Sequence, residues 1–249
     1  MNIYENERLD TVNDSITLIQ NTDGLTFGTD ALLLAGYIQG VFKKGAELGG
    51  GSGIISMLAL TRGKLDTCLA VEVQAEYAEL ISRNAELNFL SDKLSVLSSD
   101  VRGLGVTEDF DIVFTNPPYM KSDAGKMNRT DAKSIARHEI HGGISDFVAA
   151  GKRLLKYGGA FYAVYRPDRL TDIISALREN GLEPKRMTFV HADCDSESSM
   201  VLIEAKRGGK SGMQLTKPLI IYSDKTHTQY GADMEYIMKH GNFPPEYKR

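Results

Sequence analysis

The four residues Asn116-Pro117-Pro118-Tyr119 end a short apolar run, "DIVFTNPPY", and their types can do chemistry together. An asparagine side-chain oxygen and a backbone carbonyl can each accept one hydrogen of a planar amino group. Holding both hydrogens exposes the nitrogen lone pair, and fixed acceptors stabilise the charge that develops there. Proline has a fixed φ, so the Pro117 carbonyl is aimed in advance. We therefore expect Asn116, Pro117 and Tyr119 to be catalytic residues that prepare an amino or amide nitrogen for attack.

The aromatic end of this turn indicates a planar acceptor. Tyr119 offers a ring face on which a base can stack, a contact worth roughly 1–3 kcal/mol per base. We expect Pro118 and Tyr119 to contact the substrate. The alternative is a stiff loop after a strand with no catalytic role, which a second feature of the sequence disfavours.

That feature is a glycine turn, "AELGGGSG", in which Gly49, Gly51 and Gly53 stand between a predicted strand and a predicted helix. Glycine is needed where backbone approaches a ligand or takes positive φ. The start of a helix also presents backbone N–H groups that lack partners within the helix. The arrangement serves nicotinamide enzymes as well as methyltransferases, and it also suits a tight turn with no ligand.

Three acids accompany the glycine turn. Glu72 ends the next predicted strand, where a carboxylate can accept hydrogen bonds from both ribose hydroxyls of a nucleoside cofactor. Asp100 ends the strand after that, and either accepts from an adenine amino group or caps a helix. Glu47 precedes the turn and can orient the glycine loop or the amino-acid part of a cofactor.

The elements that must position these residues alternate between strand and helix. We expect strands at 15–20, 65–73, 94–100, 111–119, 160–166, 184–190 and 199–206, a strand, turn and helix within 43–63, and helices beginning at Thr29 or Asp30 and spanning 74–90, 144–159 and 167–181. Gly158 and Gly159 can cap the third of these helices. Alternation predicts an α/β fold with a mainly parallel sheet and helices on both faces. The link between the last two strands is too short for a crossover, so that pair should be antiparallel.

Composition is that of an ordinary globular protein: 249 residues, 42% hydrophobic and 25% charged, with a net charge of −4. We expect one domain, divided into an N-terminal extension (1–40), a catalytic core (41–206) and a C-terminal tail (207–249). Cys68 and Cys194 stand far apart, which fits a reducing compartment and gives no metal-ligand spacing. We expect a cytoplasmic monomer that binds no metal and no membrane.

Two segments are locally basic. Residues 121–137 contain five basic and two acidic side chains, and residues 206–217 contain four basic and no acidic ones. Such patches can hold a phosphate backbone even on an acidic protein, although solvated loop surface is the simpler explanation. The candidate phosphate contacts after the catalytic turn are Lys121, Lys126, Arg129, Lys133 and Arg137.

The combined features resemble a known family. "TFGTDALLLAGYI", "ELGGGSGIISMLAL", "FTNPPY", "ARHE" and "YRPDRL", in that order, look like the bacterial tRNA1(Val) adenine-N6-methyltransferases, over roughly residues 5 to 205. The resemblance implies a seven-stranded class I methyltransferase fold, S-adenosylmethionine as cofactor and tRNA as partner. It assigns the glycine turn and Glu72 to the cofactor, and Asn116, Pro117 and Tyr119 to the target adenine. Thr29 and Asp30 would lie near the methionine end of the cofactor, which Asn116 would also contact. Arg137, His138 and Glu139 form the "ARHE" signature, to which we assign no role.

Other activities suit the same residues. A protein methyltransferase acting on a glutamine amide also needs both hydrogens of the nitrogen held. DNA adenine methylation is a third possibility, although no separate recognition domain is evident. A binding module without catalysis is disfavoured by the intact Asn-Pro-Pro-Tyr turn. A nicotinamide oxidoreductase would have no use for that turn.

Overall fold

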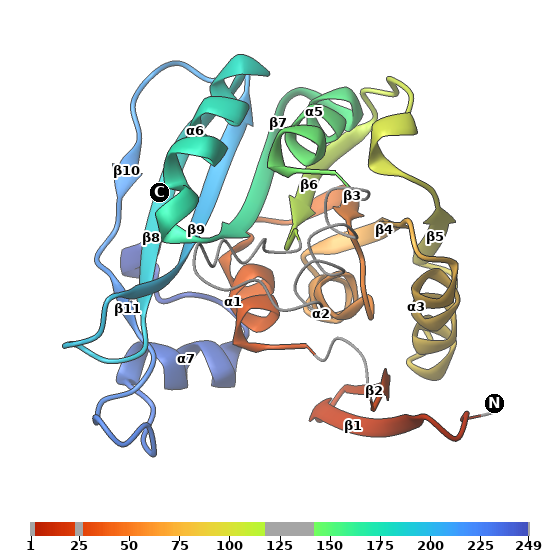
Figure 1. The fold of residues 1–249 in the computed structure, drawn as a ribbon, viewed down its shortest axis with the longest axis horizontal. Helices are drawn as coiled ribbons and strands as arrows, with labels where there is room; N and C mark the ends of the chain where they lie inside the picture. Colours follow the sequence, from red (N-terminus) through yellow and green to blue (C-terminus); the bar gives the residue numbers. More distant parts are fainter. Residues whose placement is uncertain (1–2, 23–26, 118–141, 249) are drawn as a thin grey trace, which may run out of the picture.

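Strands and helices alternate through most of the chain, and most of the strands join in one sheet (Figure 1). The computed structural model describes residues 3–22, 27–117 and 142–248. The strands are β1 (Glu7–Asn13), β2 (Ile16–Asn21), β3 (Phe42–Leu48), β4 (Leu65–Glu72), β5 (Leu94–Ser98), β6 (Phe110–Thr115), β7 (Leu155–Tyr165), β8 (Leu182–His191), β9 (Ser198–Arg207), β10 (Gln214–Leu215) and β11 (Leu219–Ile220). The helices are α1 (Thr29–Tyr37), α2 (Ile54–Thr61), α3 (Ala75–Leu87), α5 (Ile144–Leu154), α6 (Leu170–Glu179) and α7 (Ala232–His240), with short 3₁₀ turns η1 (Val101–Gly103), η2 (Pro167–Arg169) and η3 (Pro245–Tyr247).

The sheet has the order β10-β8-β9-β7-β6-β3-β4-β5, and β11 also pairs with β8. Pairs β3–β4, β3–β6, β4–β5 and β6–β7 are parallel, whereas β9 runs antiparallel to both β7 and β8. The predicted α/β class and the antiparallel final pair are therefore confirmed. The carboxyl ends of β3, β4, β6, β7 and β8 meet at one edge of the sheet, where open α/β sheets bind ligands.

Alternate residues of the central strands enter two separate core layers. Phe161, Ala163 and Tyr165 of β7 pack with residues of α5 and α6, while Tyr162 and Val164 pack with residues of α1, α2 and α7. Successive strand side chains point to opposite faces of a sheet, so both faces are buried beneath helices. Within the described residues no helix is long and apolar enough to cross a membrane.

Two predicted helix caps were wrong. The residue before α1 is Gly28, and neither Thr29 nor Asp30 is the N-cap. α5 ends at Leu154 and β7 begins directly at Leu155, so Gly158 does not cap the helix. With φ of 81°, Gly158 instead lies inside β7 where the register against β6 is irregular. Glycine suits either position, because both need a positive φ, so local sequence does not distinguish them.

The N-terminal hairpin β1–β2 docks on α3 through two asparagines one helical turn apart. Asn84 Oδ1 accepts from the Ile19 backbone at 2.7 Å, and Asn88 Oδ1 accepts from Thr17 at 3.0 Å. Each amide nitrogen donates to the carbonyl of the same β2 residue. Asn84 also donates to the Ser52 carbonyl at 3.0 Å, so the hairpin is linked to the glycine turn.

The C-terminal segment is part of the folded core. Arg186 of β8 is fully buried, where its guanidinium pairs with Glu204 at 2.9 Å. The same group donates to the Tyr247 carbonyl at 2.9 Å and to the Tyr37 carbonyl at 2.7 Å. Phe243 and Tyr247 are buried, and the Phe243 ring packs between the rings of Tyr37 and Tyr247. Residues after 207 therefore fix the end of α1 against the sheet, although their sequence reads as a polar, turn-rich tail.

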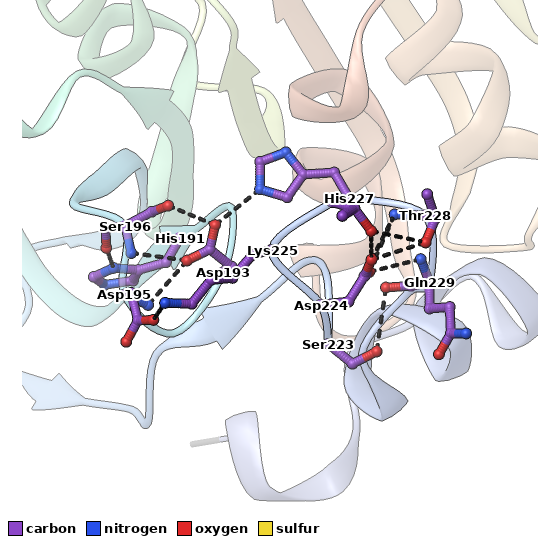
Figure 2. Close-up of polar contacts among 11 residues, drawn as sticks. His191, Asp193, Asp195, Ser196, Ser223, Asp224, Lys225, His227, Thr228 and Gln229 are labelled. Carbon is purple, nitrogen blue, oxygen red and sulfur yellow. Dashed lines mark hydrogen bonds and ion pairs between the residues drawn. The ribbon is translucent and has the colours of Figure 1, made fainter.

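A second contact joins the C-terminal segment to the turn between β8 and β9. Figure 2 shows the His227 ring directed at Asp193, with Nε2 2.8 Å from Oδ2. Ser196 donates to the same carboxylate from its backbone nitrogen and its hydroxyl, at 3.0 and 2.7 Å. His227 and these donors lower the pKa of Asp193. Tyr222 stacks on the His227 ring with centroids 4.7 Å apart.

Candidate active site

The glycine turn joins β3 to α2 at the ligand edge of the sheet. Gly49, Gly51 and Gly53 have φ values of 74°, 55° and 80°. This left-handed region costs other residues roughly 1–2 kcal/mol each, so the spacing of the three glycines is explained by the backbone itself. The Gly49 and Gly50 nitrogens both donate to the Val71 carbonyl, at 2.9 and 3.1 Å, which holds the turn against β4.

Gly51 is at the open point of this turn. A Cβ built there would meet no described atom within 4 Å, whereas one at Gly53 would lie 2.9 Å from Ile81. The glycine at 53 is thus required for packing as well as for φ. The glycine at 51 leaves room beside the backbone, as a cradle for a ligand should.

Glu72 lies at the end of β4, next to the turn, and is buried. Its Oε2 accepts from the Gly51 nitrogen at 3.0 Å, and Oε1 accepts from the Gln74 nitrogen at 3.0 Å. A carboxylate has about four acceptor positions, so each oxygen retains one for a ligand hydroxyl. The arrangement holds the carboxylate in place without consuming its capacity to bind a ribose.

Glu47 has a different environment. Its side chain is buried, and Oε2 accepts from the Ser56 nitrogen at 3.0 Å and from the Ser56 hydroxyl. Burial raises the pKa of Glu47 to about 8, against the opposing effect of the Ser56 hydrogen bonds. Of its two predicted uses, the contacts present are those of a residue that orients the first turn of α2. A direct cofactor contact stays a prediction.

Asp100 follows β5 and caps the short turn η1. Its Oδ1 accepts from the Arg102 nitrogen at 2.8 Å, and its carboxylate pairs with the Arg102 guanidinium at 2.5 Å. These are the contacts of the capping alternative. The adenine-binding alternative for Asp100 stays a prediction.

Asn116 follows β6, which lies beside β3 in the sheet. The Thr115 hydroxyl donates to the Leu48 carbonyl at 2.8 Å, which fastens the end of β6 to the start of the glycine turn. Asn116 is half-buried, Pro117 is buried, and the Asn116 amide nitrogen donates to Asp30 Oδ2 at 2.8 Å. The structure thus brings Asn116 and the start of α1 to the edge that holds the glycine turn and Glu72.

The remaining predicted site residues lie outside the described ranges. They are Pro118, Tyr119, Lys121, Lys126, Arg129, Lys133 and Arg137, together with His138 and Glu139. Within residues 3–22, 27–117 and 142–248 no group of three or more histidine, cysteine, aspartate or glutamate side chains could hold a metal ion.

The basic stretch 206–217 begins away from the ligand edge and returns toward it through β10, which runs parallel to β8. Lys206 and Arg207 end β9, and because β9 is antiparallel to β7, its end lies at the opposite edge of the sheet. Arg207 pairs with Glu108 at 2.5 Å, and Lys217 pairs with Asp233 at 2.9 Å. A second phosphate-binding patch in residues 206–217 stays a prediction.

Comparison with known proteins agrees with this geometry. Residues 21–179 match the methyltransferase small domain family. The chain belongs to that family. Its members transfer methyl groups from S-adenosylmethionine, and the positive-φ turn, the open space at Gly51 and the Glu72 carboxylate fit that cofactor. The predicted enzyme class and cofactor are confirmed.

Relatives of this methyltransferase small domain protein include two named tRNA1(Val) (adenine(37)-N6)-methyltransferase. The one from Dyadobacter fermentans is 25% identical over 194 residues, covering 78% of this chain and 80% of the relative. The one from Phocaeicola vulgatus is 26% identical over 191 residues, covering 76% and 80%. The predicted resemblance is thereby confirmed.

Solved structures confirm the class I methyltransferase fold. A predicted O-methyltransferase from Agrobacterium tumefaciens has a TM-score of 0.68 at 22% identity, covering 86% of this chain and 98% of that one. The geranyl diphosphate C-methyltransferase of Streptomyces coelicolor, solved with S-adenosyl-L-homocysteine, has a TM-score of 0.54 at 15% identity, covering 72% and 80%.

The sequence did not predict three hydrogen bonds that support the site. Ser56 donates to Glu47, Asn84 donates to the Ser52 carbonyl in the glycine turn, and Asn116 donates to Asp30. Asn84 left a signal, since asparagine is unusual on the buried face of a helix. Nothing local to Asp30 or Asn116 indicates their contact.

Proposed function

We propose that this methyltransferase transfers a methyl group to the exocyclic N6 amino group of adenine in tRNA. The observation that carries the proposal is the position of Asn116 and Pro117, fastened through Thr115 beside the glycine turn at the ligand edge of the sheet. The names of relatives that match three quarters of the chain support the choice of tRNA. The adenosine beside the anticodon of a valine tRNA is the site that those names suggest.

The cofactor residues would bind the methyl donor. The glycine turn and Glu72 would hold S-adenosylmethionine, with the Glu72 carboxylate taking the ribose hydroxyls. That cofactor, when bound, supplies the methyl group: a nitrogen–carbon bond forms, the sulfur–carbon bond breaks with its electron pair left on sulfur, and one amino hydrogen departs as a proton. Glu47 and Ser56 keep the start of α2 in register with the turn.

The acceptor residues prepare the nitrogen. Asn116 Oδ1 and the Pro117 carbonyl accept the two N6 hydrogens, which directs the lone pair away from them. The same oxygens stabilise the positive charge that develops on nitrogen, without a metal or a covalent enzyme intermediate. Positioning of the two reactants supplies much of the remaining rate. Tyr119 as a stacking platform and the basic residues 121–137 as phosphate contacts are parts of the same proposal. An anticodon loop suits it, because its bases are single-stranded and can be turned out at small cost.

The test uses tritiated S-adenosylmethionine. The protein is incubated with bulk tRNA from a bacterial strain that lacks the gene and, separately, with total protein, with Asn116→Ala as the inactive control. Labelled tRNA is then digested to nucleosides. Label in N6-methyladenosine supports the proposal. Label only in protein would replace it with methylation of a glutamine amide, which the same two acceptors can serve.

A further inference from the structure

The bond between Asp30 and Asn116 fixes which way the Asn116 amide faces. Asp30 Oδ2 lies 2.8 Å from Asn116 Nδ2. A carboxylate only accepts hydrogen bonds, so the amide nitrogen must face α1 and the amide oxygen must point away from it. Rotation about χ2 of asparagine is broad and roughly two-fold, so a hydrogen bond to a carboxylate favours one of the two orientations of the amide.

We infer that Asp30 is a positioning residue for the methyl transfer. An amino group that is to be methylated needs acceptors for its two hydrogens, and only the oxygen of the Asn116 amide is one. The flipped amide would present two more hydrogens to the substrate nitrogen. Asp30 therefore selects the productive orientation of Asn116. The inference rests on the proposed function, and it gives Asp30 a role at the acceptor rather than at the methionine end of the cofactor.

The Asp30 carboxylate also contacts the backbone at the start of α1. Its Oδ1 accepts from the Ala31 nitrogen at 2.9 Å. A Cβ at Gly28 would lie only 2.7 Å from Oδ1, so glycine at 28 makes room for this rotamer. The Phe27 nitrogen donates to Gln20 Oε1 at 3.0 Å, and Gln20 is almost fully buried. The orientation is thus set by the fold before substrate arrives, as efficient sites require.

Three variants separate positioning from other roles. Asp30→Ala removes the acceptor, and Asp30→Asn retains one acceptor oxygen. Gly28→Ala leaves the carboxylate but displaces it, and since the displaced atom ends a flexible side chain the cost to folding should be small. Asp66→Ala, an exposed aspartate at the start of β4 on the opposite edge, is the matched control.

The first measurement is the single-turnover rate of methyl transfer to whichever tRNA or protein the wild-type enzyme labels. The dissociation constant for S-adenosylmethionine is measured separately by calorimetry. Asp30→Ala should lower the rate by about 10- to 100-fold, the usual effect of misplacing a group by about 1 Å. Cofactor affinity should change by less than about threefold, which corresponds to under about 0.7 kcal/mol. Gly28→Ala should lower the rate severalfold. Asp30→Asn should react faster than Asp30→Ala, because it retains one acceptor oxygen for the Asn116 amide. The inference would be overturned if Asp30→Ala and Gly28→Ala reacted at the wild-type rate. It would also be overturned if Asp30→Ala lost cofactor affinity by the same factor as it lost rate.

The second measurement does not depend on activity. In ¹⁵N-labelled protein, the side-chain amide hydrogens of Asn116 should exchange slowly with solvent in the wild type and in Asp66→Ala, and at least tenfold faster in Asp30→Ala. Equal exchange rates in wild type and Asp30→Ala would refute the role of Asp30, even if the substrate that receives the methyl group had not been found. Failure of the proposed function would appear in the labelling experiment instead, as label outside tRNA or as activity in the Asn116→Ala variant.

Discussion

Replacing Gly51 by alanine separates the cost of backbone strain from the loss of a ligand cradle. Gly51 has φ of 55°, and a Cβ there meets no described atom within 4 Å. The only folding cost is therefore the left-handed backbone, roughly 1–2 kcal/mol. For a chain of this size that lowers the melting temperature by roughly 2–8 °C, at about 2–4 °C per kcal/mol.

Gly63 provides a matched control. It lies beyond the opposite end of α2 from the glycine turn, with φ of 65° and equally open space around its Cβ position. Gly63→Ala should lose the same stability as Gly51→Ala. Only Gly51→Ala should weaken binding of S-adenosylmethionine, by about tenfold or more, which is about 1.4 kcal/mol, because its methyl group enters the space where backbone must approach the cofactor.

The two variants are compared by thermal melting without ligand and by titration calorimetry with S-adenosylmethionine. Equal melting temperatures with unequal affinities are the expected result. If Gly51→Ala binds the cofactor as tightly as Gly63→Ala does, the glycine turn is not the cradle. If their melting temperatures differ widely, the argument from strain is wrong.

The remaining predictions concern three carboxyl groups. Glu72→Ala should weaken S-adenosylmethionine binding about 10- to 100-fold, as loss of hydrogen bonds to a charged group does, and Glu72→Gln by less; calorimetry showing unchanged affinity would remove Glu72 from the cofactor site. Because the pKa of Glu47 is raised from 4.5 to about 8, the folded protein retains a proton that the unfolded chain loses, so stability falls as pH rises from about 4.5 to about 8. Urea unfolding at pH 5 and pH 8 should show this fall in the wild type, on the order of a few kcal/mol, and a smaller one in Glu47→Gln; parallel curves would contradict it. His227→Ala should lower the melting temperature more than Lys225→Ala, because His227 bonds to Asp193 while Lys225 belongs to a solvent-exposed ion pair; equal melting temperatures would mean that this contact contributes nothing.

Most of the fold was predictable because its signals are local. Apolar runs of strand length alternate with helical patterns, and an eight-residue link cannot hold a crossover, so both the parallel sheet and its antiparallel strand follow from sequence. The glycine turn followed likewise, since positive φ at alternate positions leaves few residue choices. The end of α5 could not be predicted, because a helix cap and a strand irregularity both favour glycine.

The C-terminal segment was the largest omission. Its composition is polar and turn-rich, yet Phe243 and Tyr247 are buried and Arg186 binds the Tyr247 carbonyl from the middle of β8. A buried arginine is stable only when its donors are satisfied, and the partners here come from three distant parts of the chain. No window of sequence around any one of them contains that information.

The sequence by itself determined the chemistry available to this protein, because a glycine turn, a strand-end acid and Asn116-Pro117 each follow from local backbone and side-chain requirements. Tertiary structure alone decided how that chemistry is oriented. Asp30 and Asn116 are 86 positions apart, and they meet because α1 begins at the same sheet edge at which β6 ends. Strand direction likewise places Lys206 and Arg207 at the edge opposite the glycine turn, since β9 runs antiparallel to β7. Both outcomes depend on how elements pack across the sheet, and the energy of that packing is spread over contacts between residues far apart in sequence.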